Sequence, residues 1–499
     1  MMRDEVSARS RIQLYPDYTA EISEINRSGI SVDLLYKIIH KHKPNSEYNR
    51  KLYERYRGIK EGVPIYGRKP RYEDSEDIIN NRIANDFFGE IIDFKTGYFA
   101  GTPIAYNYAE AEDNMDAADV ISDFVTRNNM FDIDMEVTKF ASIYGYAGRL
   151  LYIDKAGEES VMPVHGYETI ILSNTNMTEP EYAVRYYYTK TIDNNKIWHV
   201  EFYDSANVYY YIGQLSDLKP DDTRTRADGK PADPVEPHMF SYCPLQGVPN
   251  NEELIGDAEK VLSNIDDYDK AVSDNSNEIE AFVHALLVFE NINVDDGEIR
   301  KAQHTGAICY RSGSNQGKAY FLTKDINDSF TEHHLERQKD NIYRFSKTPN
   351  LSDDTFGSAS GISLKFKLHG LETKCGMFQA KMMSAGVYMF KTLASSWNNR
   401  GHNIDYLNCT MDFSRNFPLD IANEAQAAVQ LKSVGLPMEL ILGQLSFVDD
   451  VQYVMDLIER DKNDIPPLNL YDTSDDSLSE SNANESLSGA VPREDRSEG

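Results

Sequence analysis

The stretch SKTPNLSDDTFGSASG, residues 346–361, leads directly into ISLKFKLHGLETKCGMFQAKMMSAGVYMFKTLASSW, residues 362–397. The first part is mostly small and polar, which predicts a loop. The second part carries apolar residues at alternating steps of four and three, which predicts a helix. At about 1.5 Å per residue this helix would be roughly 54 Å long. The sequence therefore predicts a loop followed by an unusually long helix.

The apolar residues of this helix form a regular seam at Leu364, Leu368, Leu371, Cys375, Phe378, Met382, Ala385 and Met389. Such spacing is typical of a contact between two helices. The residues that we predict for a subunit interface along this helix are Leu364, Leu368, Leu371, Lys374, Phe378, Lys381 and Met382. Gly370, Gly376 and Gly386 interrupt the pattern at about 1 kcal/mol each relative to alanine. We expect a bend or a close backbone approach there.

Elsewhere the chain reads as a mixture of helices and strands. Helices are expected at residues 31–42, 46–58, 78–98, 117–128, 132–144, 329–345, 419–434 and 447–462, and another begins at Asn250 with Glu253 as part of its cap. Short strands rich in tyrosine are expected at 149–154, 169–172, 182–189, 198–203 and 208–212, as an antiparallel meander with a turn at Asn194–Asn195. Residues 404–413 are expected to return to that sheet. The polar run 273–278 predicts a helix surface that contacts water or other chains.

The phrase SKTPNLSDDTFGSASGISLKFKLHGLETKC resembles the tunnel loop and following long helix of portal proteins from tailed bacteriophages, particularly phages with long non-contractile tails. Three more stretches resemble the same family in the same order. They are NNRIANDFFGEIIDFKTGYFAGTPIAY (80–106), VPNNEELIGDAEKVLSNIDDYDKAVSDNSNEIEAF (248–282) and FVDDVQYVMDLIERDK (447–462). The resemblance covers most of the chain, from residue 80 to residue 462.

This resemblance implies an α+β subunit, elongated and built of several parts, that assembles into a ring, normally of twelve copies, at one vertex of the capsid. It implies a β-rich wing (1–247 with 404–417), stem helices (248–283 and 328–345), a β-rich clip (284–327), a tunnel loop (346–361), a long helix (362–403) and a helical crown (418–466). Residues 467–499 read as a disordered acidic tail.

The implied function is a conduit through which DNA is packaged and ejected, without catalysis or a cofactor. Implied partners are further copies of the chain, double-stranded DNA, the terminase large subunit, the major capsid and scaffolding proteins, and a head-completion protein. The implied location is the virion, after assembly in the host cytoplasm. The residues expected to line the DNA channel are Lys347, Thr348, Asn350, Ser352, Asp353, Asp354, Thr355, Phe356, Ser358, Ser360, Lys365 and Lys367.

Lysines recur every seven residues beside the seam, at Lys367, Lys374 and Lys381. Two interpretations stay open. The ammonium groups could face the channel and attract DNA weakly, or they could pair with carboxylates on a neighbouring helix. We favour pairing for Lys374 and Lys381, and the channel for Lys365 and Lys367, which lie nearer the loop.

The chain of 499 residues has a formal net charge of −30. A protein that grips duplex DNA over a broad surface uses lysine and arginine, so this composition argues for DNA that passes rather than DNA that is held. An acidic protein that never meets DNA has the same composition. Residues 37–71 are the one long basic segment. This segment could meet an acidic partner, a neighbouring subunit or DNA, or form a solvated helix face.

Other motifs give little evidence for chemistry. Cys243, Cys309, Cys375 and Cys409 are too widely spaced for a metal site and read as free thiols, and His40 and His42 read as surface histidines. No apolar run approaches the ~20 residues that span a bilayer, so no membrane is expected.

The segment from Gly313 to Gly317, with Lys318 and Ala319 after it, is one residue too short for a phosphate-binding loop and lacks its hydroxyl. In GSASG, Ala359 stands where a nucleophile elbow needs serine. We expect no catalytic and no metal site. A DNA-processing nuclease or ATPase, or an acidic scaffold protein, remains as the alternative.

Overall fold

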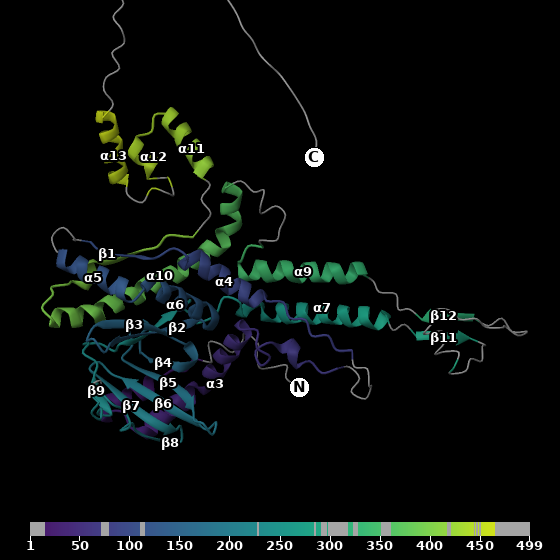
Figure 1. Cartoon of the computed structure of the whole chain (residues 1–499), viewed down its shortest axis with the longest axis horizontal. Helices are drawn as coiled ribbons and strands as arrows, with labels where there is room; N and C mark the ends of the chain where they lie inside the picture. Colours follow the sequence, from purple (N-terminus) through teal and green to yellow (C-terminus); the bar gives the residue numbers. More distant parts are fainter. Residues whose placement is uncertain are drawn as a thin grey trace, which may run out of the picture. The chain divides into compact units, whose positions relative to one another are not determined.

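The computed structural model describes residues 15–70, 79–109, 115–226, 229–283, 286–290, 318–322, 328–350, 361–416, 421–443 and 451–464, with positions 297, 445 and 448. The chain divides into two compact units, Met1–Pro418 and Leu419–Gly499, which are treated separately below. Helices and antiparallel sheets both occur in the first unit (Figure 1). This mixture confirms the predicted α+β class.

The helical core of the first unit is built around the long helix. Its helices include α4 (Phe87–Ala100), α5 (Met115–Arg127), α6 (Met130–Tyr144) and α10 (Gly361–Asn399). The helix that was expected from residue 78 begins instead at Phe87. The Asp86 side chain accepts a hydrogen bond from the Gly89 N–H at 2.9 Å and caps the helix there. The predicted start is therefore wrong by about two and a half turns.

A second correction concerns α3 (Val32–Tyr56), which is one helix where the sequence predicts two. It continues through Pro44, although proline removes a helical hydrogen bond. Tertiary contacts offset that loss. Ser46, two residues after Pro44, is buried, and its hydroxyl donates to the Tyr167 carbonyl at 2.7 Å.

The tyrosine-rich sheet is an antiparallel meander, as predicted. Its strands are β4 (Thr169–Leu172), β5 (Tyr182–Lys190), β6 (Lys196–Tyr203), β7 (Asn207–Gln214) and β8 (Asp217–Pro220), in sequence order, and β9 (Val235–Pro237) also pairs with β7. The turn between β5 and β6 contains Asn194 at a φ of 62°, which confirms the predicted hairpin. One face of the sheet is covered by α2 (Thr19–Ser28) and α3, whose apolar residues share a core with it.

Two predicted members of this sheet belong elsewhere. Strand β2 (Tyr146–Ile153) lies between β10 (Leu245–Pro249) and β3 (Glu159–Val164) in a separate sheet. Strand β13 (Cys409–Asp412) pairs with β1 (Ala105–Tyr108). The alternate residues of β13, Cys409 and Met411, are buried in the helical core, so this strand is held by α10 and its neighbours rather than by the meander.

Helices α7 (Leu262–Val283) and α9 (Asp328–Ser346) form an antiparallel pair (Figure 1). The Asn264 amide donates to Gln338 at 2.9 Å, and His334 lies 2.9 Å from Asp267. Between these helices in the sequence, β11 (Leu286–Glu290) pairs with β12 (Lys318–Leu322). The glycine-rich segment before β12 lies outside the described residues.

The start of α7 differs from the prediction. The helix begins at Leu262, after a short 3₁₀ turn (Glu259–Val261), and not at Asn250. The Asn250 side chain is buried and its amide donates to the Ile255 carbonyl at 2.9 Å, so it does not cap a helix. Other 3₁₀ turns are Pro64–Gly67, Gly166–Glu168 and Tyr406–Asn408.

The polar side of α7 contacts its own chain. Residues 79–86 form neither helix nor strand, and three alternate backbone N–H groups of this segment point towards α7. The N–H groups of Asn81, Ile83 and Asn85 donate to Asn277, Ser273 and Asp269 at 2.6, 2.9 and 2.8 Å. The prediction that residues 273–278 contact water or other chains is therefore wrong for Ser273 and Asn277. Both side chains accept hydrogen bonds from backbone N–H groups of residues 79–86.

The second unit contains α11 (Ile421–Ser433), α12 (Met438–Leu442) and α13 (Val451–Asp464). Helices α11 and α13 match those expected at 419–434 and 447–462, and α12 lies between them. Gly435 follows α11 with a φ of 91°, a conformation that favours glycine, and Pro437 stands at the N-cap of α12.

Candidate functional site

The seam of α10 lies in the core of its own chain. Leu368, Leu371, Cys375, Phe378, Met382, Ala385 and Met389 are all buried, none more than 4% exposed. Phe378 packs edge-on against Phe99 of α4, with ring centroids 4.8 Å apart. Four of the predicted interface residues therefore pack within their own chain. They are Leu368, Leu371, Phe378 and Met382. The side chain of Leu364 lies outside the described residues.

Gly386 allows a close approach, but by a side chain rather than by the expected backbone. A Cβ atom at Gly386 would overlap the Met411 sulfur, so the Met411 side chain packs more closely on α10 than it could on a larger residue. One residue earlier, the Ala385 carbonyl accepts hydrogen bonds from Arg149 at 2.8 Å and from Gln246 at 3.0 Å. Gly370 is in ordinary contact with Lys347.

A buried carboxyl group lies beside that arginine. Burial raises the pKa of Asp134 to about 7, against the opposing effects of the Tyr106 hydrogen bond and the Arg149 charge. The Tyr106 hydroxyl donates to the carboxylate at 2.6 Å. Burial also lowers the pKa of Arg149. This group holds β1, α6 and β2 together beneath α10.

Three ionisable side chains meet at the other end of the seam. The Lys95 ammonium is 2.8 Å from one oxygen of Asp257, and the Lys374 ammonium is 3.4 Å from the other. Burial by itself would raise the pKa of Asp257, but Lys374 and Lys95 together lower it to about 2. Burial lowers the pKa of Lys374, although Asp257 opposes this. Lys95 also donates to Asn250 and lies over the Phe378 ring.

The first residues of the predicted tunnel loop adjoin this cluster. Lys374 donates to the carbonyl of Ser346, the last residue of α9, at 2.9 Å. Lys347 follows with a φ of 59° and is exposed, whereas Thr348 is buried. A cavity of about 110 Å³ is lined by Ser346, Lys347, Lys374 and Asp257, among others. The structure thus brings together two residues that the sequence assigned separately, Lys347 to the channel and Lys374 to an interface.

Most of the other residues predicted to line the channel are not described by the structure. Ser352, Asp353, Asp354, Thr355, Phe356, Ser358 and Ser360 lie outside the described residues, as does the side chain of Lys365. Lys367 and Asn350 are partly exposed on either side of that gap. Their assignment to a channel stays a prediction.

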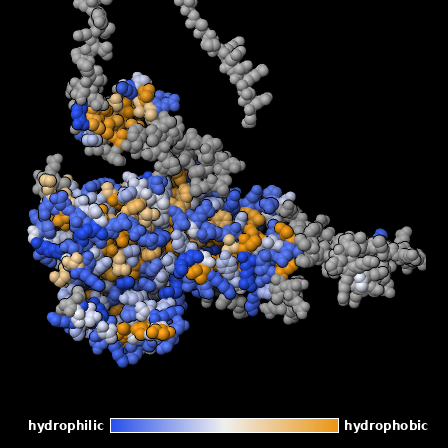
Figure 2. Space-filling view, viewed as in Figure 1, coloured by the Kyte–Doolittle hydropathy of each residue, from blue (hydrophilic) through white to orange (hydrophobic). Residues whose placement is uncertain are grey.

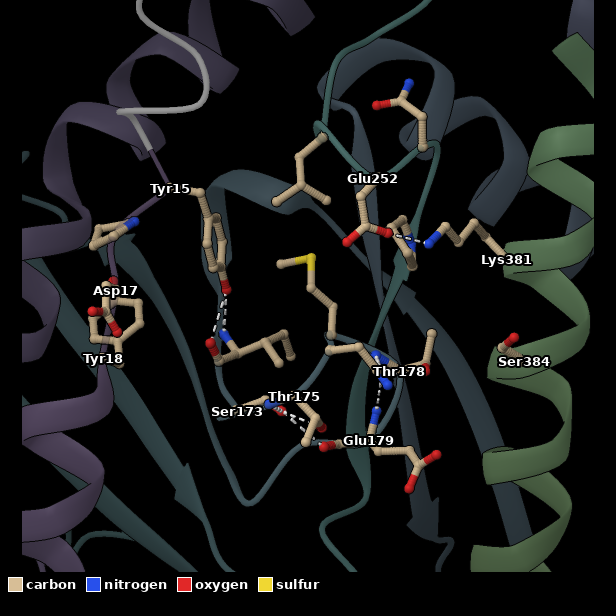
Figure 3. Close-up of a pocket in the computed structure, with 17 residues that line it drawn as sticks. Tyr15, Asp17, Tyr18, Ser173, Thr175, Thr178, Glu179, Glu252, Lys381 and Ser384 are labelled. Atoms are coloured by element: carbon tan, nitrogen blue, oxygen red, sulfur yellow. Dashed lines mark hydrogen bonds and ion pairs between the residues drawn. The ribbon is translucent and has the colours of Figure 1, made fainter.

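Lys381 lies on the wall of a larger cavity. It forms an ion pair with Glu252, and both line a cavity of about 350 Å³ between α10 and the residues that precede α2 (Figure 3). Across the cavity, the Tyr15 hydroxyl both donates to the Ile171 carbonyl and accepts from the Ile171 N–H, each at 2.9 Å. Lys374 and Lys381 therefore both pair with carboxylates. However, Asp257 and Glu252 belong to the same chain and lie in turns before α7, not on the neighbouring helix that was expected.

Much of the basic segment is paired within the chain as well. Arg55 is 2.6 Å from Asp266, Arg68 pairs with Asp274, and Lys41 is 2.8 Å from Glu21. The segment therefore helps to attach the N-terminal part of the chain to α7.

Sequence reasoning missed several buried polar residues, and His42 is the clearest case. It was expected at the surface but is fully buried, with its ring nitrogens 2.9 Å from the Tyr186 hydroxyl and 3.2 Å from that of Tyr146. The helical period gives a signal, because His42 falls on the same face as Ile38 and Ile39.

The described residues hold few features of a reactive site. Among them, no group of three or more histidine, cysteine, aspartate or glutamate residues is placed to bind a metal ion. Cys243, Cys375 and Cys409 are buried free thiols, as expected, and Cys309 is not described. Within the same residues, a search for helices that are both long and apolar enough to cross a bilayer finds none.

Comparison with known proteins finds similar sequences. A family model described as "Phage portal protein, SPP1 Gp6-like" matches residues 35–467. A protein named "Portal protein" from Bacillus phage SPP1 is 26% identical over 426 residues, covering 81% of this chain and 82% of its own length. Another of that name, from Clostridium phage phiCD119, is 23% identical over 423 residues, covering 81% of this chain and 89% of its own.

A solved structure described as "Neck of empty GTA particle computed with C6 symmetry" aligns with 75% of this chain and 90% of its own. Its TM-score is 0.42 and its sequence identity 9%. That similarity is too low to support a statement about the fold.

Proposed function

This chain belongs to the SPP1 Gp6-like family of phage portal proteins, and we propose that its copies form a ring around a channel for phage DNA. The observation that carries the proposal is the family match over residues 35–467, which includes helices of both compact units. A ring of identical subunits, twelve in the usual case, fits head-to-tail contacts that close after a fixed rotation.

We assign the parts of the subunit by their order in the sequence. The antiparallel helices α7 and α9 are proposed as the stem, and β11 with β12 as the base of the clip. Residues 346–361 are proposed as the tunnel loop, α10 as the long helix, and α11 to α13 as the crown. The sheets of residues 1–247, with residues 404–417, form the proposed wing.

The proposed partners follow from this assignment. Double-stranded DNA passes through the channel, and a net charge of −30 suits DNA that slides rather than binds. The terminase large subunit docks on the clip during packaging, and a head-completion protein replaces it. The major capsid and scaffolding proteins surround the ring in the virion, after assembly in the host cytoplasm. Neither catalysis nor a cofactor is part of the proposal.

The subunit contact through α10 is proposed to use the residues that the chain leaves exposed, because the seam itself is buried. Met377, Met383 and Val387 are between 46% and 50% exposed on this helix. On the stem, Ile279, Phe330 and Phe345 are more than half exposed, and hydrophobic residues are visible over α7 and α9 (Figure 2). Two different apolar surfaces on one subunit suit a head-to-tail contact.

Electron microscopy of the purified full-length chain, with a native mass measurement, tests the ring. We expect a ring of twelve or thirteen subunits with an axial hole. A chain that stays monomeric at high concentration and with capsid partners would contradict the proposal.

Deletion of residues 346–361 tests the tunnel loop. We expect rings to form while DNA packaging or retention fails, and unaffected packaging would overturn the assignment. An ATPase assay of the purified chain addresses the enzymatic alternative. ATP turnover that depends on Lys318 would favour that alternative.

A further inference from the structure

The cluster of Lys95, Asp257 and Lys374 contains more positive than negative charge in a buried place. The side chains of Lys95, Asp257 and Lys374 are 0%, 2% and 12% exposed. Two ammonium groups therefore share one carboxylate. Because desolvation makes a buried charge costly unless it is paired, a second cation here needs a further partner.

The end of α9 supplies that partner. Carbonyl groups in the last turn of a helix have no partner within the helix and carry the negative end of the helix dipole. Lys374 donates to one of them, the Ser346 carbonyl, at 2.9 Å. The chain leaves the helical conformation at the next residue, Lys347. The Lys374 ammonium thus joins the core helix α10 to the point where α9 ends.

We propose that Lys374 is a positioning residue for the channel, since its ammonium group fixes the end of α9, and with it the start of the tunnel segment, to α10. The inference rests on the proposed function for the channel, but the attachment itself is a separate claim about α9. Lys95 has a different role, because it pairs with Asp257, donates to Asn250 and lies over the Phe378 ring.

The charge balance makes this role separable from folding. Replacing Lys374 by methionine keeps the apolar stem and leaves one buried ammonium with one buried carboxylate, a neutral pair. We therefore expect K374M to fold and assemble. It loses the contact with Ser346 and the ion pair with Asp257, while Asp257 keeps its partner Lys95. Replacing Asp257 would instead leave two unpaired cations and disturb the core.

The helix offers a matched control. Lys381 is seven residues after Lys374, on the same side of α10, and pairs with the exposed Glu252 rather than with α9. K381M removes the same charge from the same helix without touching Ser346. K374R is the conservative variant, because arginine keeps both the charge and the donor.

Hydrogen exchange of the assembled full-length protein tests the attachment. The N–H groups of Lys347 and Thr348 donate to Arg344 and Tyr343 at 3.3 and 3.1 Å and report on the end of α9. In K374M we expect both to exchange at least about tenfold faster through local opening, while amides in the middle of α10 do not change. K374R should restore protection, and K381M should leave it unchanged.

DNA retention in particles that carry each variant then tests the role in the channel. We expect loss of retained DNA for K374M and normal retention for K374R and K381M. Unchanged exchange in K374M, exchange raised throughout α10, or normal DNA retention despite faster exchange would each overturn the proposal. If K374M does not fold, K374Q takes its place in the experiment. The proposal would then be overturned if the Lys347 and Thr348 N–H groups of K374Q exchange as slowly as those of the unchanged chain.

Failure of the proposed function looks different. In that case the unchanged chain forms no ring and retains no DNA, while the exchange of Lys347 and Thr348 still decides whether Lys374 holds α9.

Discussion

Helices α10 and α7 are both long, and each packs against its own chain, but they do so with opposite chemistry. Helix α10 buries an apolar seam in a core of helices. Helix α7 presents Asp269, Ser273 and Asn277 to the backbone of residues 79–86. The first contact depends on the area removed from water, and the second on hydrogen bonds that replace those with water.

The contact of α7 depends on a match between two repeats. Residues four apart on a helix advance by about 6.0 Å, and residues two apart on an extended chain advance by about 6.6 Å. Side chains at 269, 273 and 277 can therefore meet alternate N–H groups at 85, 83 and 81 in antiparallel order. A polar stripe on a helix can thus mark a contact within the chain as specifically as an apolar one does.

The largest effect is expected in the apolar contact. Phe378 is fully buried against Phe99 and Lys95, so F378A should lower the free energy of unfolding by about 3–5 kcal/mol. Thr373 is exposed on the same helix, where its hydroxyl donates to the His369 carbonyl. T373A should change the free energy of unfolding by no more than about 0.5 kcal/mol. Urea unfolding monitored by circular dichroism measures both. Equal losses would show that the seam is not the main contact of α10.

The ionic cluster at the end of the seam should come next. D257N leaves two buried ammonium groups without their carboxylate, and we expect a loss of about 3 kcal/mol. The pKa of Asp257 is lowered to about 2 in the folded chain, below about 3.9 for an unfolded aspartate. Its contribution is therefore complete above about pH 4 and is lost as the pH falls towards 2.

Melting temperatures between pH 2 and pH 6 measure this pH dependence. The difference between the unchanged chain and D257N should shrink as the pH falls below about 4. A difference that stays constant down to pH 2 would contradict the assigned charge state of Asp257.

The polar contact of α7 should show a smaller effect. S273A removes the hydroxyl that accepts from the Ile83 N–H at 2.9 Å, and we expect a loss of about 1–2 kcal/mol. Ser384, exposed on α10, donates to Ala380 within its own helix, and S384A is the matched control. Faster hydrogen exchange at Ile83 in S273A, but not in S384A, would locate the effect. No change in stability or exchange would show that residues 79–86 are held by other contacts.

The smallest effect is expected for an exposed ion pair. Lys381 pairs with Glu252, whose side chain is 82% exposed, and such pairs contribute between 0 and about 1 kcal/mol. K381M should therefore change the free energy of unfolding by less than about 1 kcal/mol, and raised salt should reduce the difference. A loss as large as that of D257N would mean that Lys381 is buried by something that the single chain does not contain.

The sequence by itself determined the helices and strands whose residue pattern is regular. The apolar repeat of α10 and the tyrosine-rich alternation of β4 to β8 suffice, because the period of a pattern selects one backbone geometry. The family resemblance also came from the sequence, through four stretches in a fixed order. Element starts were less well determined. The Asp86 cap decides the start at Phe87, and a 3₁₀ turn precedes the start at Leu262.

Only the tertiary structure decided which surfaces meet. An apolar seam indicates that one face of a helix is buried, but it does not indicate which element buries it. In α10 the seam is buried in the core of its own chain rather than against a neighbouring subunit. The partners of Lys374 are 28 and 117 residues away in the sequence, at Ser346 and Asp257. His42 and Ser273 look like surface residues because they are polar. Burial of a polar group depends on a partner that the local sequence does not contain, and only the folded chain brings that partner within hydrogen-bonding distance.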